Sequence, residues 1–198
     1  MGRKREFDEE AVLAGAMMAF RRHGYAGLSV IELEAATQIS AGSLYNAYGD
    51  KEGLYRAVFD FYFRKVIDPR IGAAQTLDDL EKVAIDLFNP PFSDGLGCLV
   101  TNAAVEFRNS AGTGGHFAGR GLDIIEAAAL RAVRADMGDG NEPAALRIVL
   151  LYQGMLVLTR AGRLSNAYKD AVRAEFDRLR RQAKSTFPAI REQNAKGD

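Results

Sequence analysis

Apolar residues recur at intervals of three and four along most of the chain, which is the spacing of helices that bury one face. In residues 8–23 this face holds Leu13, Met17 and Phe20, and Gly24 follows as a helix stop. No run alternates convincingly between apolar and polar residues, as a half-buried strand would. The pattern therefore predicts an all-α protein.

Residues 29–51 predict two short helices joined by a tight turn, with a third helix directly after them. Ser29, Ser40 and Asp50 are placed as N-caps, because their side chains can accept hydrogen bonds from unpaired backbone N–H groups. Glu32 completes a capping box with Ser29. This helix-turn-helix pattern presents a helix end to the DNA major groove. An ordinary helical hairpin is the alternative.

Helices are expected through the rest of the chain. The helix that begins at Lys51 is expected to stop before Pro69, and the next should run from the cap pair Thr76 and Asp79 to Pro90-Pro91. Gly-rich loops are expected over about residues 93–97 and 110–115. Further helices are expected over about residues 98–107, 116–137, 142–161 and from 165 to Pro188.

The last two expected helices differ in character. Residues 148–158 are the most apolar stretch of the chain, and such a helix must be buried on nearly all sides. The following helix is amphipathic, with a stripe of Tyr168, Val172, Phe176, Leu179 and Ala183. Together they suit a homodimer in which both helices and their copies form a four-helix bundle. A monomer whose own core absorbs both helices is the alternative.

Composition fits a cytoplasmic globular protein. Of 198 residues, 47% are hydrophobic, and 26 Lys and Arg balance 26 Asp and Glu. The single Cys is compatible with the cytosol. No apolar run reaches the roughly 18 residues of a membrane span, and no signal peptide is recognisable. Arg3, Lys4 and Arg5 form a basic arm that is either a phosphate or minor-groove contact or a solvated tail.

Enzyme chemistry and metal binding are not predicted. The chain has no P-loop, no dinucleotide-binding glycine motif and no GxSxG motif. Cys98 is interpreted as a small buried hydrophobe rather than a nucleophile paired with His116, and His23 as a cap at a helix C-terminus. Two His and one Cys, far apart, do not suggest a metal site, and no cofactor is implied.

Several motifs in the first third of the chain belong together. They are Gly24-Tyr25, Ser29-Val30, Ile39-Ser40-Ala41-Gly42-Ser43-Leu44-Tyr45 and Tyr48-Gly49-Asp50-Lys51-Glu52-Gly53-Leu54. Over about residues 7–66 the sequence resembles the DNA-binding domain of TetR-type (TetR/AcrR family) transcriptional regulators. It departs from that family at Gln38, where Gly is usual and enters a positive-φ conformation more cheaply. It also departs at Ala47-Tyr48, where His-Phe is usual, although Tyr48 can still supply the core aromatic residue.

The resemblance implies two domains. The first is a helix-turn-helix DNA-binding domain over residues 7–66, with the motif at about 29–48, and the second is a helical ligand-binding and dimerisation domain over residues 67–198. A ligand pocket is also implied, since helical bundles hold ligands between helices. Candidate lining residues, each with plain core as the alternative, are Phe88, Phe92, Cys98, Asn102, Phe107, Phe117, Ile124, Tyr152 and Met155. Polar groups that could orient a ligand are Glu106, Arg108 and Arg120.

The residues expected to contact DNA lie in and beside the helix over residues 40–48. This helix has no Lys or Arg, so the common Arg contact to guanine is missing. Base reading is assigned to Gln38, Ser43 and Asn46, apolar contact to Ala41, and phosphate contact to Ser40, Gly42 and Tyr45. The resemblance supports Tyr45 and Lys51 as phosphate contacts. Ser29 and Tyr48 complete the set of candidate DNA-binding residues. Gly42 has an alternative role, which is a tight contact with the first helix.

These observations predict a ligand-responsive transcriptional regulator that acts as a repressor. As a homodimer it would bind a palindromic double-stranded DNA operator with half-sites about 34 Å apart, and a small molecule would release it. The alternative is a helical small-molecule-binding or scaffold protein without DNA binding. The sequence leaves open the effector, the operator, activation in place of repression, and one or two dimers per operator.

Overall fold

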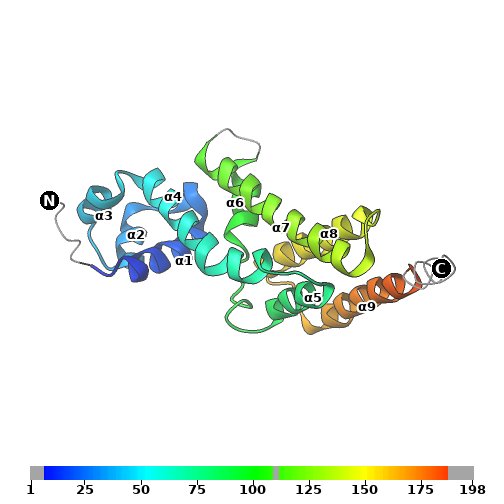
Figure 1. Cartoon of the computed structure of the whole chain (residues 1–198). Coiled ribbons are helices and arrows are strands. Elements are labelled where there is room, and N and C mark those ends of the chain that lie inside the picture. Colours follow the sequence, from blue (N-terminus) through cyan, green and yellow to red (C-terminus); the bar gives the residue numbers. More distant parts are fainter. Residues whose placement is uncertain (1–6, 109–111, 187–198) are drawn as a thin grey trace. The chain divides into compact units, whose positions relative to one another are not determined.

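The computed structural model describes residues 7–108 and 112–186, and every regular element in this part of the chain is a helix (Figure 1). The all-α prediction is therefore confirmed. The elements are α1 (Glu9–Gly27), α2 (Val30–Thr37), α3 (Ala41–Tyr48), α4 (Lys51–Tyr62), η1 (Phe63–Gly72), α5 (Leu77–Ile85), η2 (Asp86–Phe88), α6 (Leu99–Phe107), α7 (Thr113–Met137), α8 (Glu142–Arg160), η3 (Asn166–Tyr168) and α9 (Lys169–Thr186).

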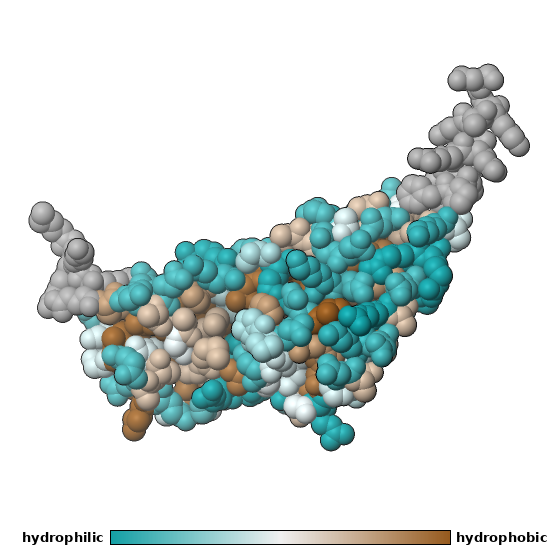
Figure 2. Space-filling view, turned by 90° about the horizontal axis from the view of Figure 1, so that it is seen from below, coloured by the Kyte–Doolittle hydropathy of each residue, from teal (hydrophilic) through white to brown (hydrophobic). Residues whose placement is uncertain are grey.

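The helices form two compact units. The first consists of the chain up to residue 69 together with residues 96–122, and the second consists of residues 70–95 together with the chain from residue 123. The resemblance places a boundary at residue 66, but residues 96–122 return to the first unit, so that α6 and the beginning of α7 belong with α1 to α4. Hydrophobic side chains reach the surface of both units on the face shown in Figure 2.

Local sequence signals account for the ends of the first helices. Ser29, Ser40 and Asp50 each accept backbone N–H groups as N-caps, which confirms the three predicted caps, and Asp8 caps α1 in the same way. Gly24 interrupts α1 with φ 75° and ψ 175°, a backbone conformation that favours glycine, and one further turn follows it. The predicted stop at Gly24 is therefore present as a break inside the element.

The expected stop before Pro69 was wrong. After α4 the chain continues as the π-helix η1, with Pro69 inside it. A proline ring clashes with the carbonyl four residues earlier in an α-helix, whereas a π-helix uses a wider turn with bonds over five residues. Phe63, Ile67 and Ile71 are buried at intervals of four residues and hold this turn in place.

Other boundaries were closer to expectation. The Thr76 and Asp79 capping box begins α5 as predicted. The helix expected from residue 116 begins at Thr113, so His116 lies in its first turns and not in a loop. The last helix begins with the short η3 before α9. Its expected end at Pro188 lies outside the described residues.

The predicted role of the stripe on α9 was wrong. Val172, Phe176 and Leu179 are buried within a single chain, where α9 packs against α5, and only Tyr168 is exposed. The apolar helix α8 departs from expectation in the opposite direction. It was expected to be buried on nearly all sides, but Leu146, Leu150 and Val157 are 50%, 72% and 52% exposed. Helix α8 is thus buried on one face, and its other face carries apolar side chains to the surface.

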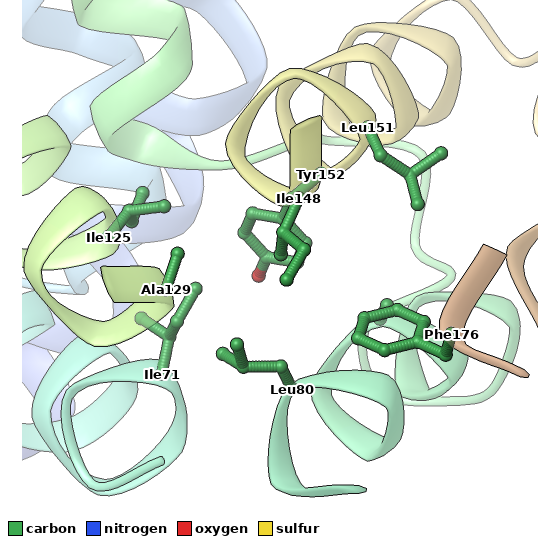
Figure 3. Close-up of a pocket in the computed structure, with 9 residues that line it drawn as sticks. Ile71, Leu80, Ile125, Ala129, Ile148, Leu151, Tyr152 and Phe176 are labelled. Atoms are coloured by element: carbon green, nitrogen blue, oxygen red, sulfur yellow. The ribbon is translucent and has the colours of Figure 1, made fainter. Parts of the chain in front are cut away.

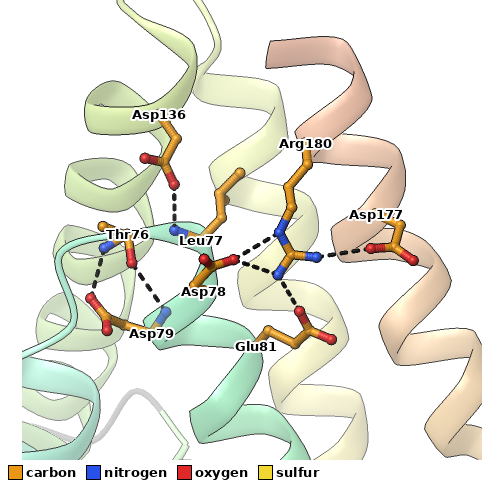
Figure 4. A network of polar contacts seen from close by, with 8 residues as sticks. All are labelled: Thr76, Leu77, Asp78, Asp79, Glu81, Asp136, Asp177 and Arg180. Carbon is orange, nitrogen blue, oxygen red and sulfur yellow. Dashed lines mark hydrogen bonds and ion pairs between the residues drawn. The ribbon is translucent and has the colours of Figure 1, made fainter. Parts of the chain in front are cut away.

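An ion-pair network fixes α9 to α5 (Figure 4). The Arg180 guanidinium donates to Asp78 over 2.8 Å and to Asp177 over 2.9 Å, and it also binds Glu81. Burial alone would lower the pKa of Arg180, but the hydrogen bonds to Glu81 and Asp78 outweigh it and raise that pKa. The backbone N–H of Leu77 donates to Asp136 of α7 over 2.7 Å, which ties the start of α5 to a third helix.

Helix α8 is long and apolar enough to cross a membrane, judged by length and composition alone, although no run of that length was expected. The core helix of a globular protein passes the same test. Ala144, Ile148, Met155 and Leu156 of α8 are buried among the helices of the second unit, as in such a core helix.

Candidate nucleic-acid interface

The turn between α2 and α3 has the predicted helix-turn-helix geometry. The Ser29 N–H donates to Glu32 over 2.7 Å, and the Glu32 N–H donates to the Ser29 hydroxyl over 3.3 Å. The pKa of Glu32 lies below its ordinary value, chiefly because the carboxylate accepts hydrogen bonds from the Ser29 backbone and side chain. Leu33 and Leu44 are fully buried and fasten the two helices to the core. The outward faces of both helices are thereby fixed.

Gln38 adopts a left-handed conformation in this turn, with φ 58° and ψ 24°. That conformation costs an ordinary L-residue about 1–2 kcal/mol. The Gln38 side-chain amide donates to the Ala35 carbonyl over 2.5 Å, which satisfies one of the acceptors left open at the end of α2. The turn thus keeps the shape that glycine allows in the family, and the side chain offsets part of the strain.

The residues expected to contact DNA surround the start of α3. Asn46 is exposed on α3, whereas the hydroxyl oxygen of Tyr48 is buried. Six of the ten residues have exposed side chains or backbone: Ser29, Gln38, Ser40, Gly42, Ser43 and Asn46. Four are half-buried: Ala41, Tyr45, Tyr48 and Lys51.

Gly42 faces open space. A Cβ atom built on it would meet nothing nearer than the Ser40 hydroxyl oxygen at 3.9 Å. The alternative role of Gly42, a tight contact with the first helix, is therefore contradicted. Gly15 and Gly53 show what such a contact looks like, because a Cβ atom there would overlap a backbone carbonyl oxygen.

Lys51 is held within the first unit. Its ammonium donates to the Leu28 carbonyl and lies 4.9 Å from the centre of the Tyr25 ring. Burial lowers the pKa of Lys51, and the charges of Glu106 and Glu32 oppose that shift. The side chain therefore joins the start of α4 to the residue before the Ser29 cap. Its charge stays near the surface on which phosphate contact is expected.

Charge on the two helices is negative. Residues 24–50 contain Glu32, Glu34 and Asp50 and no Lys or Arg. The Glu34 carboxylate accepts the Ala41 N–H over 2.5 Å, so one negative group already sits at the N-terminus of α3. Residues 24–50 therefore add no basic side chain to this surface, and Lys51 beside it is the cation assigned to phosphate contact. Hydroxyl, amide and backbone N–H groups remain as the contacting chemistry.

Sequence reasoning missed the polar contacts that hold α6 against the end of α1. The Glu106 carboxylate accepts the N–H groups of Tyr25 over 2.9 Å and Ala26 over 2.7 Å, directly after the Gly24 break. One turn earlier, Asn102 donates to the Leu96 carbonyl over 2.9 Å and the Arg21 carbonyl over 3.4 Å. The spacing of four residues between Asn102 and Glu106 places both on one face of α6, but it does not identify their partners.

The residues proposed to line a ligand pocket do not form one cluster. In the first unit, Phe107 lies 5.5 Å from the Tyr25 ring and Phe117 is stacked 4.9 Å from Phe59. Those in the first unit are Cys98, Asn102, Phe107 and Phe117, and those in the second are Phe88, Phe92, Ile124, Tyr152 and Met155. Tyr152 is the member of this set that lines a described cavity, which lies wholly in the second unit (Figure 3).

Two of the three polar candidates for a ligand bind protein groups. Glu106 binds the backbone after Gly24, as above, and the Arg120 guanidinium lies 3.8 Å from Asp60 and 4.3 Å from the centre of the Phe63 ring. Arg108 is exposed at the end of α6 with φ 52°. These three residues lie in the first unit and do not border the cavity that Tyr152 lines.

Comparison with known proteins gives this geometry its context. Residues 12–58, which contain α2, α3 and most of α1 and α4, match the model of the tetR family of bacterial regulatory proteins. These residues are therefore a DNA-binding domain of the TetR family. This is a family of transcriptional regulators and not of enzymes.

One curated relative is the HTH-type transcriptional repressor ComR of Escherichia coli, which is 46% identical to this chain over 61 residues. Those residues make up 31% of this chain, and the chain spans only 29% of the length of ComR. The sequence similarity is thus concentrated in one part of both proteins.

Solved structures extend the likeness to the whole fold. A TetR transcriptional regulator from Legionella pneumophila is 19% identical with a TM-score of 0.72, over 90% of this chain and 98% of that one. A cysteine mutant of the TetR family regulator CifR, complexed with a 26 bp operator DNA, is 22% identical with a TM-score of 0.65 and the same coverage. At these identities the likeness concerns the fold.

Proposed function

We propose that this chain is a DNA-binding transcriptional regulator that represses its target genes. The observation that carries the proposal is the exposed, capped start of α3, where polar groups surround an unobstructed Gly42. ComR is named a repressor, and CifR was solved with operator DNA. Both support the same role here. The cytoplasm is the proposed compartment, since that is where operator DNA lies in bacteria.

The proposed DNA contacts are of two kinds, namely contacts to base edges and contacts to phosphates. Asn46 and Ser43 would reach base edges, since Asn pairs with adenine in the major groove. Ser40, Tyr45 and Lys51 would hold phosphates through hydroxyl groups and the ammonium. Gln38 and Ala41 lie beside them, with Ser29 at the start of α2. The backbone N–H of Gly42 adds a donor that a close approach would bring to a phosphate.

The proposed homodimer forms through α8. Leu146, Leu150 and Val157 lie on one helix face at intervals of four and seven residues and are exposed in the single chain. A second copy of α8 would cover them, and two-fold symmetry would match a palindromic operator. This face replaces the α9 stripe, which the protomer itself buries.

Replacing Leu150 tests the dimer. Leu150→Glu would place a charge in the contact and should shift the protein to a monomer in sedimentation analysis at micromolar concentration. Val105→Glu is a matched control, since Val105 is similarly exposed at 71% on α6 and should leave the oligomeric state unchanged. A dimeric Leu150→Glu variant would exclude this interface.

The proposed control by an effector is a population shift. A small molecule that binds the second unit more tightly in one state of the dimer would favour a spacing of the two α3 helices that does not fit the operator. Binding of the chain to DNA upstream of its own gene, against scrambled DNA, tests the central proposal. Equal affinity for both at several salt concentrations would favour a helical ligand-binding or scaffold protein instead.

A further inference from the structure

Ile31 has the most exposed large hydrophobic side chain among the described residues, at 77%. It is the second residue of α2 and follows the Ser29 cap by two positions. On the inner face of the same helix, Leu33 is fully buried. A single apolar side chain at a protein surface needs no special role. The position of Ile31 therefore decides what the side chain can contact.

Ile31 lies on the face of α2 that leads to the start of α3. Residues three, four and seven positions apart share one face of a helix, so Ile31 lines up with Glu34, Ala35 and Gln38. The Glu34 carboxylate accepts the Ala41 N–H over 2.5 Å at the first position of α3, the neighbouring helix (Figure 1). Ile31 precedes Glu34 by less than one helical turn, a rise of about 4.5 Å. Its exposed hydrocarbon therefore belongs to the surface on which DNA contact is proposed.

The polar groups of this surface are already bonded within the protein. Like Glu34, Gln38 uses its side chain internally, since its amide donates to the Ala35 carbonyl over 2.5 Å. The Ser40 hydroxyl accepts the Ser43 N–H over 3.3 Å and donates to the Ser43 hydroxyl over 3.1 Å. Guanine is most often read by Arg or Lys, and cytosine by Glu or Asp. This face of α2 has no Arg or Lys, and its carboxylate is engaged.

Thymine offers the base edge that suits a hydrocarbon side chain. Its C5-methyl group lies in the major groove, where apolar side chains contact it. Placing that methyl group against Ile31 removes apolar surface of both partners from water, which is favourable. Cytosine has no methyl group at this place and presents a polar amino group beside it. The same side chain would therefore gain less from cytosine.

We propose that Ile31 contacts the C5-methyl group of a thymine in each operator half-site and selects thymine over cytosine there. The exposed Ala35, one turn further along α2, adds a second methyl group beside this contact. Ile31 is thus a specificity-determining residue outside α3, and sequence reasoning did not select it. The inference rests on the proposed function, because it requires the α2–α3 surface to face the major groove.

The probe for the test is a DNA duplex that the full-length protein itself selects from a random-sequence library. Each thymine in turn is replaced by 2′-deoxyuridine, which keeps the base pair and lacks the C5-methyl group. At one position of each half-site this change should weaken binding about fourfold, as the transfer free energy of one methyl group predicts. Fluorescence anisotropy measures the affinity.

Ile31→Ala and Val105→Ala form a matched pair of variants. Both remove an exposed branched side chain from the first unit, since Val105 is 71% exposed on α6. Ile31→Ala should bind the thymine duplex more weakly and should bind the deoxyuridine duplex equally well as the thymine duplex. Val105→Ala should keep the full fourfold effect. Because both side chains are exposed, both variants should retain the Tm of the unmodified protein.

The inference is overturned if no deoxyuridine position weakens binding, or if the effect persists in Ile31→Ala. A change in the oligomeric state of Ile31→Ala in sedimentation analysis would assign the side chain to a protein contact and overturn it too. If the full-length protein selects no sequence from the library, the proposed function fails, and this inference fails with it. A selected sequence whose binding does not depend on Ile31 overturns this inference alone. The two failures are thus distinguishable.

Discussion

Gly42→Ala should separate DNA binding from stability. Nothing but the Ser40 hydroxyl, 3.9 Å away, lies near the Cβ atom that this change adds. Because Gly is about 0.5–1 kcal/mol less favourable than Ala inside a helix, the variant should be more stable by up to that amount. If α3 approaches DNA closely at this position, the same methyl group should obstruct the contact. Operator affinity should fall at least tenfold, which is about 1.4 kcal/mol.

The assay pairs urea unfolding with fluorescence anisotropy on labelled operator. Gly15→Ala and Gly53→Ala serve as controls, since the added methyl group there would overlap the carbonyl oxygens of Ala36 and Tyr48. These variants should lose stability, and any loss of DNA binding should follow the loss of folding. A Gly42→Ala variant with unchanged operator affinity would refute the assignment of this surface to close DNA contact.

Five further substitutions test the turn, the cap and the assigned contacts. Gln38→Gly should relieve about 1–2 kcal/mol of left-handed strain, less about 0.5–1 kcal/mol of added chain freedom, and raise the urea midpoint, whereas Gln38→Ala should lower it. The pKa of Glu32 is lowered in the folded state. Its contribution to folding stability is therefore fully present above its usual pKa of 4.5 and is lost as the pH falls through the lowered value. The stability difference between the unmodified protein and Glu32→Gln should therefore shrink as the pH falls below 4.5, and a constant difference would count against the cap. Lys51→Ala should weaken operator and scrambled DNA equally and reduce the salt slope by about 0.9 per phosphate, whereas Asn46→Ala should cost about 1–3 kcal/mol on operator alone.

Local signals predicted the first unit well because they act within a few residues. The caps at Ser29, Ser40 and Asp50 depend on side chains that bond to N–H groups two or three positions away. The departure at Gln38 was visible for the same reason, since one residue must take the left-handed conformation. Its hydrogen bond to the Ala35 carbonyl is also local. The sequence alone was therefore enough to predict the helix starts and the turn that form the candidate DNA-binding surface.

Features that depend on distant partners were not predictable in the same way. Pro69 continues a helix because buried residues on either side hold a wider turn. The α9 stripe is apolar whether a partner subunit or the same chain covers it, and only the fold showed that Phe176 is buried within the protomer. Glu106 pairs with backbone N–H groups 80 and 81 residues away, and no sequence pattern identifies such acceptors.

The negative charge of the α2–α3 surface affects how the protein would be released from DNA. Electrostatic attraction acts over about a Debye length and tolerates small displacements, but residues 24–50 supply no cation for it. The hydroxyl, amide and N–H groups at the start of α3 act only within about 3.2 Å and in favourable directions. Moving two such helices apart by a small distance therefore breaks most of the contacts at once. An effector would need to bias only a small change in geometry to release the operator, because little long-range attraction would hold the displaced helices on the DNA.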